Sequence, residues 1–132
     1  MKLLLDTCAL LWAIGDLKKL SKTAILEIKN PDNVVMASAV SLWEIALKQS
    51  IGKLSLNFDI NDIPSYCKKM DFELIPLDPL DALESSKLPP NKIHKDPFDR
   101  ILIYQCIKSN YILVSKDSKI GIYKKNGLNF LW

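Results

Sequence analysis

Five acidic residues follow apolar segments of the sequence closely enough to share one site. Asp6 ends the first apolar run, and Asp117 comes two residues after the fourth predicted strand. Glu44 falls in the first turns of the helix after the second apolar run, and Asp96 and Asp99 begin a long C-terminal helix. Because parallel strands of an open α/β sheet end at the same edge, we expect these carboxylates to converge there.

Carboxylates gathered at one edge repel one another strongly unless cations lie between them. Their hard oxygen ligands suit Mg²⁺ or Mn²⁺. Such ions can hold a phosphodiester, lower the pKa of an attacking water and stabilise the leaving oxygen. The sequence therefore predicts a divalent metal site whose chemistry is compatible with phosphodiester hydrolysis.

Each acid also has a purely structural interpretation. Asp6 can cap the helix that follows it, Asp117 can be a turn residue, and Ser41-x-x-Glu44 matches a capping box. Asp96-Pro97-Phe98-Asp99 supplies an N-cap, a proline and an acid, which favour any helix start. Asp78-Pro79-Leu80-Asp81 repeats the same pattern where we predict no chemistry, so this pattern alone is weak evidence for a site.

Polar residues beside these acids are candidates for supporting roles. Thr7 and Ser115 adjoin strand ends, where their hydroxyls either bind the water of a metal ion or only complete turns. Arg100, the only arginine, either orients Asp99, contacts a phosphate or forms a surface ion pair. His94 is the only histidine, which excludes catalytic histidine pairs and multi-histidine zinc sites. We expect it to lie in a loop, where it touches the substrate or faces water.

An alternation of strand-like and helix-like segments must position these residues. Short apolar runs predict strands, and capped segments between them predict helices. The expected strands are residues 2–5, 34–37, 72–76, 111–115 and 128–132, and the expected helices are 7–14, 21–29, 38 or 41 to 49, 62–69, 78–86 and 96–108. This alternation indicates an α/β fold, a three-layer α/β/α domain with a central, largely parallel sheet.

The length of 132 residues predicts one domain, residues 1–132. No segment resembles a signal peptide or a membrane span. Trp12 and Trp43 fit apolar helix faces and are expected in the core. The three cysteines form no metal-binding pattern, and we expect buried free thiols in a reducing cytoplasm. These cysteines are Cys8, Cys67 and Cys106.

Positive charge is concentrated in the last third of the chain. Residues 1–86 carry 9 lysines and 12 acidic residues, whereas residues 87–132 carry 9 basic and 3 acidic residues. A polyanionic partner would favour the second segment, although a solvated lysine-rich surface is the plainer interpretation. Glycine-rich nucleotide loops and the G-x-S-x-G motif are absent, which excludes ordinary dinucleotide-binding, P-loop and α/β-hydrolase sites.

Four segments together resemble the PIN-domain ribonucleases, and most of all the VapC-like toxins of bacterial type II toxin–antitoxin modules. They are Leu3-Leu4-Leu5-Asp6-Thr7, Ser41-Leu42-Trp43-Glu44-Ile45, His94-Lys95-Asp96-Pro97-Phe98-Asp99-Arg100 and Leu113-Val114-Ser115-Lys116-Asp117. Their order and spacing cover nearly the whole chain. The resemblance implies a Mg²⁺- or Mn²⁺-dependent endoribonuclease that acts on RNA, forms a homodimer and is inhibited by a cognate antitoxin protein.

The resemblance also assigns roles to individual residues. It places the four catalytic acids at Asp6, Glu44, Asp99 and Asp117. Asp6 and Asp99 are expected to bind the metal directly, and the other two through water or a second ion. The expected supporting residues are Thr7, Asp96, Arg100 and Ser115.

Three other classes of function remain open at the level of sequence. One is a related metal nuclease that cleaves DNA. Another is a receiver-like signalling domain, which also gathers acids at strand ends, although Lys116 is only roughly placed for it and no paired acids follow the first strand. The third is a non-enzymatic protein-binding module in which the acids only cap helices. Leu11, Trp12 and Leu42 are candidates for a dimer or antitoxin interface, or for the core.

Overall fold

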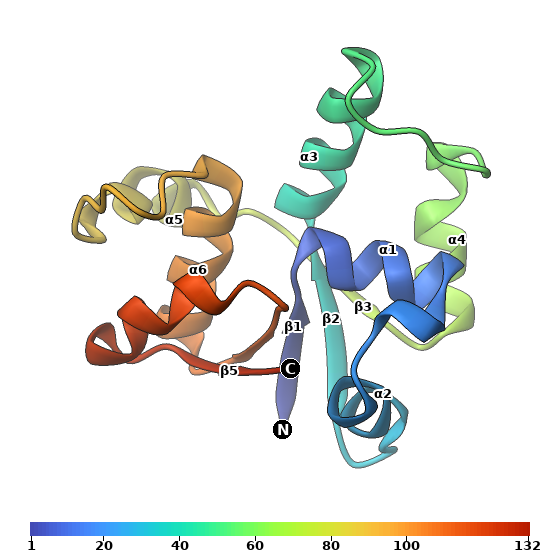
Figure 1. Cartoon of the computed structure of the whole chain (residues 1–132), viewed down its shortest axis with the longest axis horizontal. Helices are drawn as coiled ribbons and strands as arrows, with labels where there is room; N and C mark the ends of the chain where they lie inside the picture. The colour runs from blue at the N-terminus through green and yellow to red at the C-terminus, as the bar shows by residue number, and fades with distance from the viewer.

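The computed structural model describes residues 1–132 and is built on a five-stranded parallel sheet (Figure 1). The strands lie in the order β3-β2-β1-β4-β5. Parallel neighbours cannot be joined by a tight hairpin, so their connections need crossover segments. The predicted parallel sheet is confirmed. The strands are β1 (Lys2–Leu5), β2 (Val34–Ser38), β3 (Glu73–Ile75), β4 (Ile112–Val114) and β5 (Asn129–Leu131).

Helices cover both faces of this sheet. Leu3 and Leu5 of β1 pack with residues of α1, α2 and α4 on one face, whereas Leu4 packs with α6 and η4 on the other. The predicted three-layer arrangement is therefore confirmed. The α-helices are α1 (Thr7–Gly15), α2 (Lys22–Lys29), α3 (Ala39–Ser50), α4 (Ile63–Lys69), α5 (Pro79–Glu84) and α6 (Pro97–Ser109). The 3₁₀ helices are η1 (Leu17–Lys19), η2 (Ile60–Asp62), η3 (Ser85–Lys87) and η4 (Ser118–Asn126).

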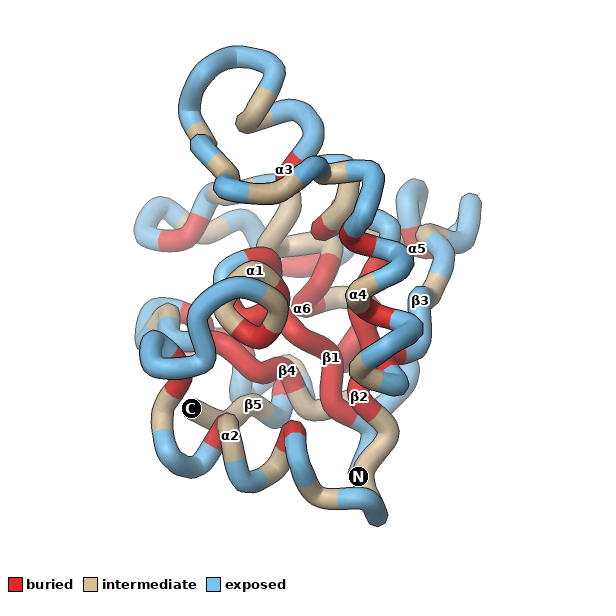
Figure 2. The backbone as a smooth tube through the Cα atoms, turned by 90° about the vertical axis from the view of Figure 1, so that its right-hand side faces the viewer, coloured by how far each residue is buried: buried red, intermediate tan, exposed pale blue.

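The central strand is buried from both sides. Leu3, Leu4 and Leu5 have no exposed surface, and the buried parts of β1, β2 and β4 fill the middle of the molecule (Figure 2). A strand covered on both faces needs a continuous apolar run, which is the pattern seen in the sequence. The longest helix, α6, has 13 residues. No helix meets the length and apolarity of a membrane span.

Polar side chains begin the helices that matter for the site. Asp6, Ser38 and Asp96 each accept a hydrogen bond from an amide in the first turn of the helix that follows. Such caps satisfy amides that have no partner within the helix. The caps fix where α1, α3 and α6 start at the carboxyl edge of the sheet (Figure 1).

Two expectations about burial are wrong. Trp43 has 55% of its surface exposed, because it lies on the outer side of α3, where its ring meets the edge of Phe98. Cys8 is exposed because it lies in the first turn of α1 beside open space, whereas Cys67 and Cys106 are buried as expected. The 3₁₀ helix η4 was not predicted, since its sequence carries no regular apolar period.

Candidate active site

An acidic cavity of about 350 Å³ lies at the carboxyl edge of the sheet, where the sequence predicts a site. Five acids line it, and we call them the acidic cluster: Asp6, Glu44, Asp96, Asp99 and Asp117. They come from the end of β1, from α3, from the start of α6 and from the turn after β4. The structure thus brings together all four predicted catalytic acids. The remaining lining residues are Thr7, Cys8, Trp12, Lys48 and Lys116.

Asp6 both caps α1 and lines the cavity. Its amide donates to the carbonyl of Val114 at 3.1 Å, which ties it to the neighbouring strand β4. Its Oδ1 accepts a hydrogen bond from the amide of Ala9 at 2.7 Å, so it caps α1. Burial raises the pKa of Asp6 above its ordinary value, against the lowering effects of the Ser115 hydroxyl and the Ala9 amide. A cation beside this carboxylate would favour its charged form.

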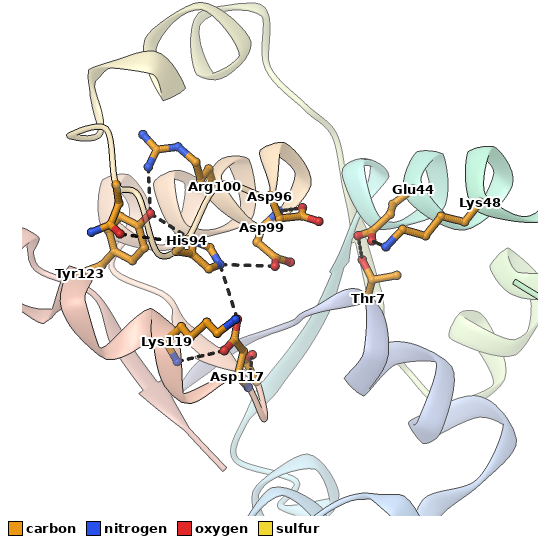
Figure 3. Close-up of polar contacts among 12 residues, drawn as sticks. Thr7, Glu44, Lys48, His94, Asp96, Asp99, Arg100, Asp117, Lys119 and Tyr123 are labelled. Atoms are coloured by element: carbon orange, nitrogen blue, oxygen red, sulfur yellow. Dashed lines mark hydrogen bonds and ion pairs between the residues drawn. The ribbon is translucent and has the colours of Figure 1, made fainter. Parts of the chain in front are cut away.

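Glu44 is buried, with 4% of its surface exposed, and it is held by two partners. The Thr7 hydroxyl donates to its Oε1 at 2.6 Å, and the Lys48 ammonium pairs with its Oε2 (Figure 3). The hydrogen bond to Glu44 raises the pKa of Lys48, which keeps the ammonium charged. The structural alternative in which Glu44 only caps the amide of Ser41 is wrong, because Ser38, the other helix start considered, caps α3 and Glu44 accepts its hydrogen bond from Thr7.

Asp96 and Asp99 share the start of α6. Asp96 Oδ1 accepts a hydrogen bond from the Asp99 amide at 3.0 Å, so Asp96 caps the helix that carries Asp99. The pKa of Asp99 rises to about 7, first because the carboxyl is buried and then because the other four carboxylates of the acidic cluster surround it. This part of the cavity is therefore short of positive charge.

Asp117 begins η4 and is placed by the turn after β4. Its amide donates to the Ser115 hydroxyl at 3.2 Å, and its Oδ1 accepts a hydrogen bond from the Lys119 amide at 2.9 Å. Ser115 is itself buried. Its hydroxyl thus stabilises the turn that presents Asp117, which is the structural interpretation considered for it.

His94 lies in a loop as expected, but of the two placements considered for it, facing water is wrong, because only 3% of its surface is exposed. Its Nδ1 lies 3.1 Å from the hydroxyl of Tyr123. Its Nε2 lies 3.4 Å from Asp99 Oδ2 and 3.6 Å from Asp117 Oδ2 (Figure 3). Burial lowers the pKa of His94, which favours the neutral imidazole. Sequence reasoning missed the burial of this residue beside two acids of the cluster.

Arg100 forms no ion pair, so the surface ion pair considered from the sequence is wrong. Its guanidinium donates to the carbonyls of Leu88 and Pro89 at 2.7 and 3.0 Å, and to the Tyr123 hydroxyl at 2.8 Å. These bonds fasten the segment before His94 to α6 and η4. Arg100 supports the site through this segment and does not touch the cavity.

The donor set of the cavity fits a divalent cation. Of the five acids, only Glu44 pairs with a lysine, Lys48. The raised pKa values of Asp6 and Asp99 arise from burial and from neighbouring negative charge, and a cation offsets both causes. Carboxylate oxygens of this kind suit Mg²⁺ and Mn²⁺.

Comparison with known proteins relates nearly the whole chain to one family and one fold. Residues 3–126 match the family described as the PIN domain. Among solved structures, VapBC2 from Rickettsia felis bound to a DNA fragment from its promoter contains a chain that superposes with a TM-score of 0.67 at 16% identity. That superposition covers 99% of this chain and 98% of the other.

Two further solved structures have the same fold. The VapBC-1 structure from nontypeable Haemophilus influenzae gives a TM-score of 0.66 at 15% identity, over 99% of this chain and 97% of that chain. The DNA-bound VapBC structure from Salmonella typhimurium gives 0.60 at 13% identity, over 99% and 97%. A search of curated proteins found no match.

Proposed function

Because the chain belongs to the PIN-domain family, we propose that it is a Mg²⁺- or Mn²⁺-dependent endoribonuclease and the toxin of a type II toxin–antitoxin module. The observation that carries this proposal is the acidic cluster, in which burial first and the neighbouring carboxylates second raise the pKa of Asp99 to about 7. Family membership favours a nuclease over the receiver-like and protein-binding alternatives.

Asp6 and Asp99 would hold the ion directly, and Glu44 and Asp117 would complete the site through water or a second ion. When bound, the ion would supply positive charge for the scissile phosphate and acidify an attacking water. Hydrolysis by water needs no ribose 2′-hydroxyl, so we expect products with a 5′-phosphate and a 3′-hydroxyl.

The remaining residues of the cavity hold and position groups. Lys48 forms an ion pair with Glu44, while Thr7 fixes the orientation of its carboxylate. Asp96 fixes the first turn of α6 and thereby Asp99. Lys116 is exposed at the edge of the cavity, where it suits an RNA phosphate next to the cleaved one.

The proposed partners follow from the relatives. The structural neighbours were solved as VapBC complexes, and we expect a cognate antitoxin protein for this chain and assembly as a homodimer. Co-expression with the protein of an adjacent short reading frame should relieve growth inhibition by this chain. If the neighbouring protein neither binds the chain nor relieves inhibition, the toxin–antitoxin part of the proposal fails.

A cleavage assay tests the enzymatic part. Purified protein is incubated with single-stranded RNA or DNA of the same sequence, in Mg²⁺, Mn²⁺ or excess EDTA. We expect cleavage of RNA with either ion, none in EDTA, and none by Asp6→Asn or Asp99→Asn. Asp32→Asn is a matched control, because Asp32 is exposed in the turn before β2 and lines no part of the cavity. Undiminished cleavage in EDTA would exclude the metal mechanism, and cleavage of DNA alone would favour a DNA nuclease.

A further inference from the structure

We propose that His94, Asp99 and Asp117 form a mixed nitrogen and oxygen site for a borderline divalent transition-metal ion, Zn²⁺ above all, within the acidic cavity. The inference rests on the proposed function in that Asp99 and Asp117 belong to its metal-dependent centre. It goes further because it adds a nitrogen ligand and changes which ions the protein prefers.

The distances fit such a site. His94 Nε2 lies 3.4 Å from Asp99 Oδ2 and 3.6 Å from Asp117 Oδ2, and one ligand atom from each residue lies within 4.8 Å of the others. Two ligands of a tetrahedral ion with bonds of about 2.1 Å are separated by about 3.4 Å. The three side chains point toward one another from α6, from the turn after β4 and from the segment before α6 (Figure 3).

The Nε2 atom of His94 provides an independent observation. The side chain is 97% buried, and Nε2 is inaccessible to solvent and has no hydrogen-bond partner. A buried polar atom left without a partner destabilises the folded state, so such atoms are rare in folded proteins. This atom faces two carboxylates, and an ion between the three groups would satisfy all of them.

The other ring nitrogen has the partner that a metal-binding histidine needs. Ligating histidines usually donate their second ring N–H to a hydrogen-bond acceptor, which fixes the ring orientation. His94 Nδ1 lies 3.1 Å from the Tyr123 hydroxyl, which also accepts a hydrogen bond from Arg100 at 2.8 Å. A hydroxyl oxygen has two lone pairs, so it can accept from both groups and leave the Nε2 lone pair free.

The nitrogen ligand predicts selectivity among ions. Imidazole nitrogen suits Zn²⁺ and other later transition metals, whereas Mg²⁺ strongly prefers oxygen and retains its waters. We therefore expect Zn²⁺ to engage His94, and Mg²⁺ to bind the carboxylates without it. Zinc bound in this way would occupy two carboxylates that the proposed reaction needs, and would compete with Mg²⁺ there.

Nuclear magnetic resonance of the single histidine tests this directly. The untagged protein is labelled with ¹⁵N at histidine only, so every ring signal belongs to His94. A Cys8→Ser background removes the exposed thiol that lines the same cavity and would compete for zinc. Long-range ¹H–¹⁵N spectra are recorded without metal, with Zn²⁺ and with Mg²⁺. We expect Zn²⁺ alone to shift the Nε2 resonance and to leave the proton on Nδ1.

A variant provides the second measurement. His94→Asn retains an amide that can reach Tyr123 but places no atom where Nε2 lies. We expect it to lower Zn²⁺ affinity by about 10-fold or more, measured by calorimetry, with Mg²⁺ affinity nearly unchanged. Zinc that binds without changing either ring nitrogen resonance would overturn the inference, even if His94→Asn fails to fold. These readouts need no RNA, so a failure of cleavage would count against the proposed function and not against this site.

Discussion

The Thr7 hydroxyl donates a hydrogen bond to Oε1 of Glu44 across 2.6 Å, although the two residues are 37 positions apart. This bond joins the first turn of α1 to α3 beside the cavity. We expect Thr7→Val, which keeps the shape and removes the donor, to lower the single-turnover rate of RNA cleavage by about 10-fold, because outer partners orient metal-binding carboxylates. Losing a hydrogen bond to a charged group should also cost about 2 kcal/mol in unfolding free energy.

Two variants make this prediction specific. Thr7→Ser restores a hydroxyl, and we expect it to recover most of the cleavage rate. Thr23 is the only other threonine, and it is exposed on α2, so Thr23→Val controls for the substitution itself. A Thr7→Val protein that cleaves RNA as fast as wild type would show that Glu44 needs no positioning by this hydroxyl.

Asp99 makes the stability of the metal-free protein depend on pH. Its pKa is about 7 in the folded protein, against roughly 3.9 in an unfolded chain. A carboxyl whose pKa is raised by folding stabilises the fold below its unfolded pKa, and this contribution is lost as the pH rises through 7. In EDTA, we expect Asp99→Asn to be more stable than wild type at pH 8 by on the order of 2 kcal/mol, and to lose this advantage at pH 4.

Urea unfolding at both pH values measures this difference. Mg²⁺ should reverse the order at pH 8, since it stabilises only the protein that retains the ligand. Asp81→Asn provides the contrast, because Asp81 pairs with Lys108 and its loss should destabilise the protein at pH 8. Equal unfolding free energies of wild type and Asp99→Asn at both pH values would mean that the charged form of Asp99 does not destabilise the folded protein.

The two D-P-x-D segments explain what the sequence can and cannot predict. Asp78 and Asp96 both cap the helices after them. The four residues of the D-P-x-D pattern are enough to predict this capping role. Asp81 pairs with a lysine of α6, whereas Asp99 faces other carboxylates. That difference depends on which elements pack nearby. The position of an acid just after a strand is therefore the feature that predicts the site, because a parallel sheet brings the ends of its strands together.

His94 and Lys48 mark two different limits of the sequence. Lys48 stands four residues after Glu44, a helical spacing that is sufficient to predict their ion pair. Nothing near His94 predicts its burial, because the covering residue, Tyr123, lies 29 positions away in the 3₁₀ helix η4. Long-range packing of irregular segments has no periodic signature, so such contacts emerge only from the fold.

Asp96 allows capping to be separated from metal binding. Its Oδ1 accepts the Asp99 amide, so Asp96→Ala should cost about 1 kcal/mol of stability and also lower the cleavage rate by loosening Asp99. Asp96→Ser retains a capping oxygen, and we expect it to restore both. Asp78→Ala removes the equivalent cap of α5 and should cost stability alone. If Asp96→Ser is stable but does not cleave RNA, the carboxylate itself is required at the metal.

Lys116 connects the basic C-terminal segment to the cavity. It is exposed, it lines the cavity, and its ammonium lies 5.9 Å from the centre of the Trp12 ring. We expect Lys116→Gln to weaken RNA binding and to reduce the slope of log affinity against log salt by about 0.7, the value for one phosphate contact on a single strand. Binding of a fluorescent RNA to protein carrying Asp6→Asn, measured at several salt concentrations, gives this slope.

Lys29→Gln is the control, because Lys29 is exposed at the end of α2, outside the cavity. Equal slopes for wild type and Lys116→Gln would show that Lys116 contacts no phosphate and that the RNA approaches from another side.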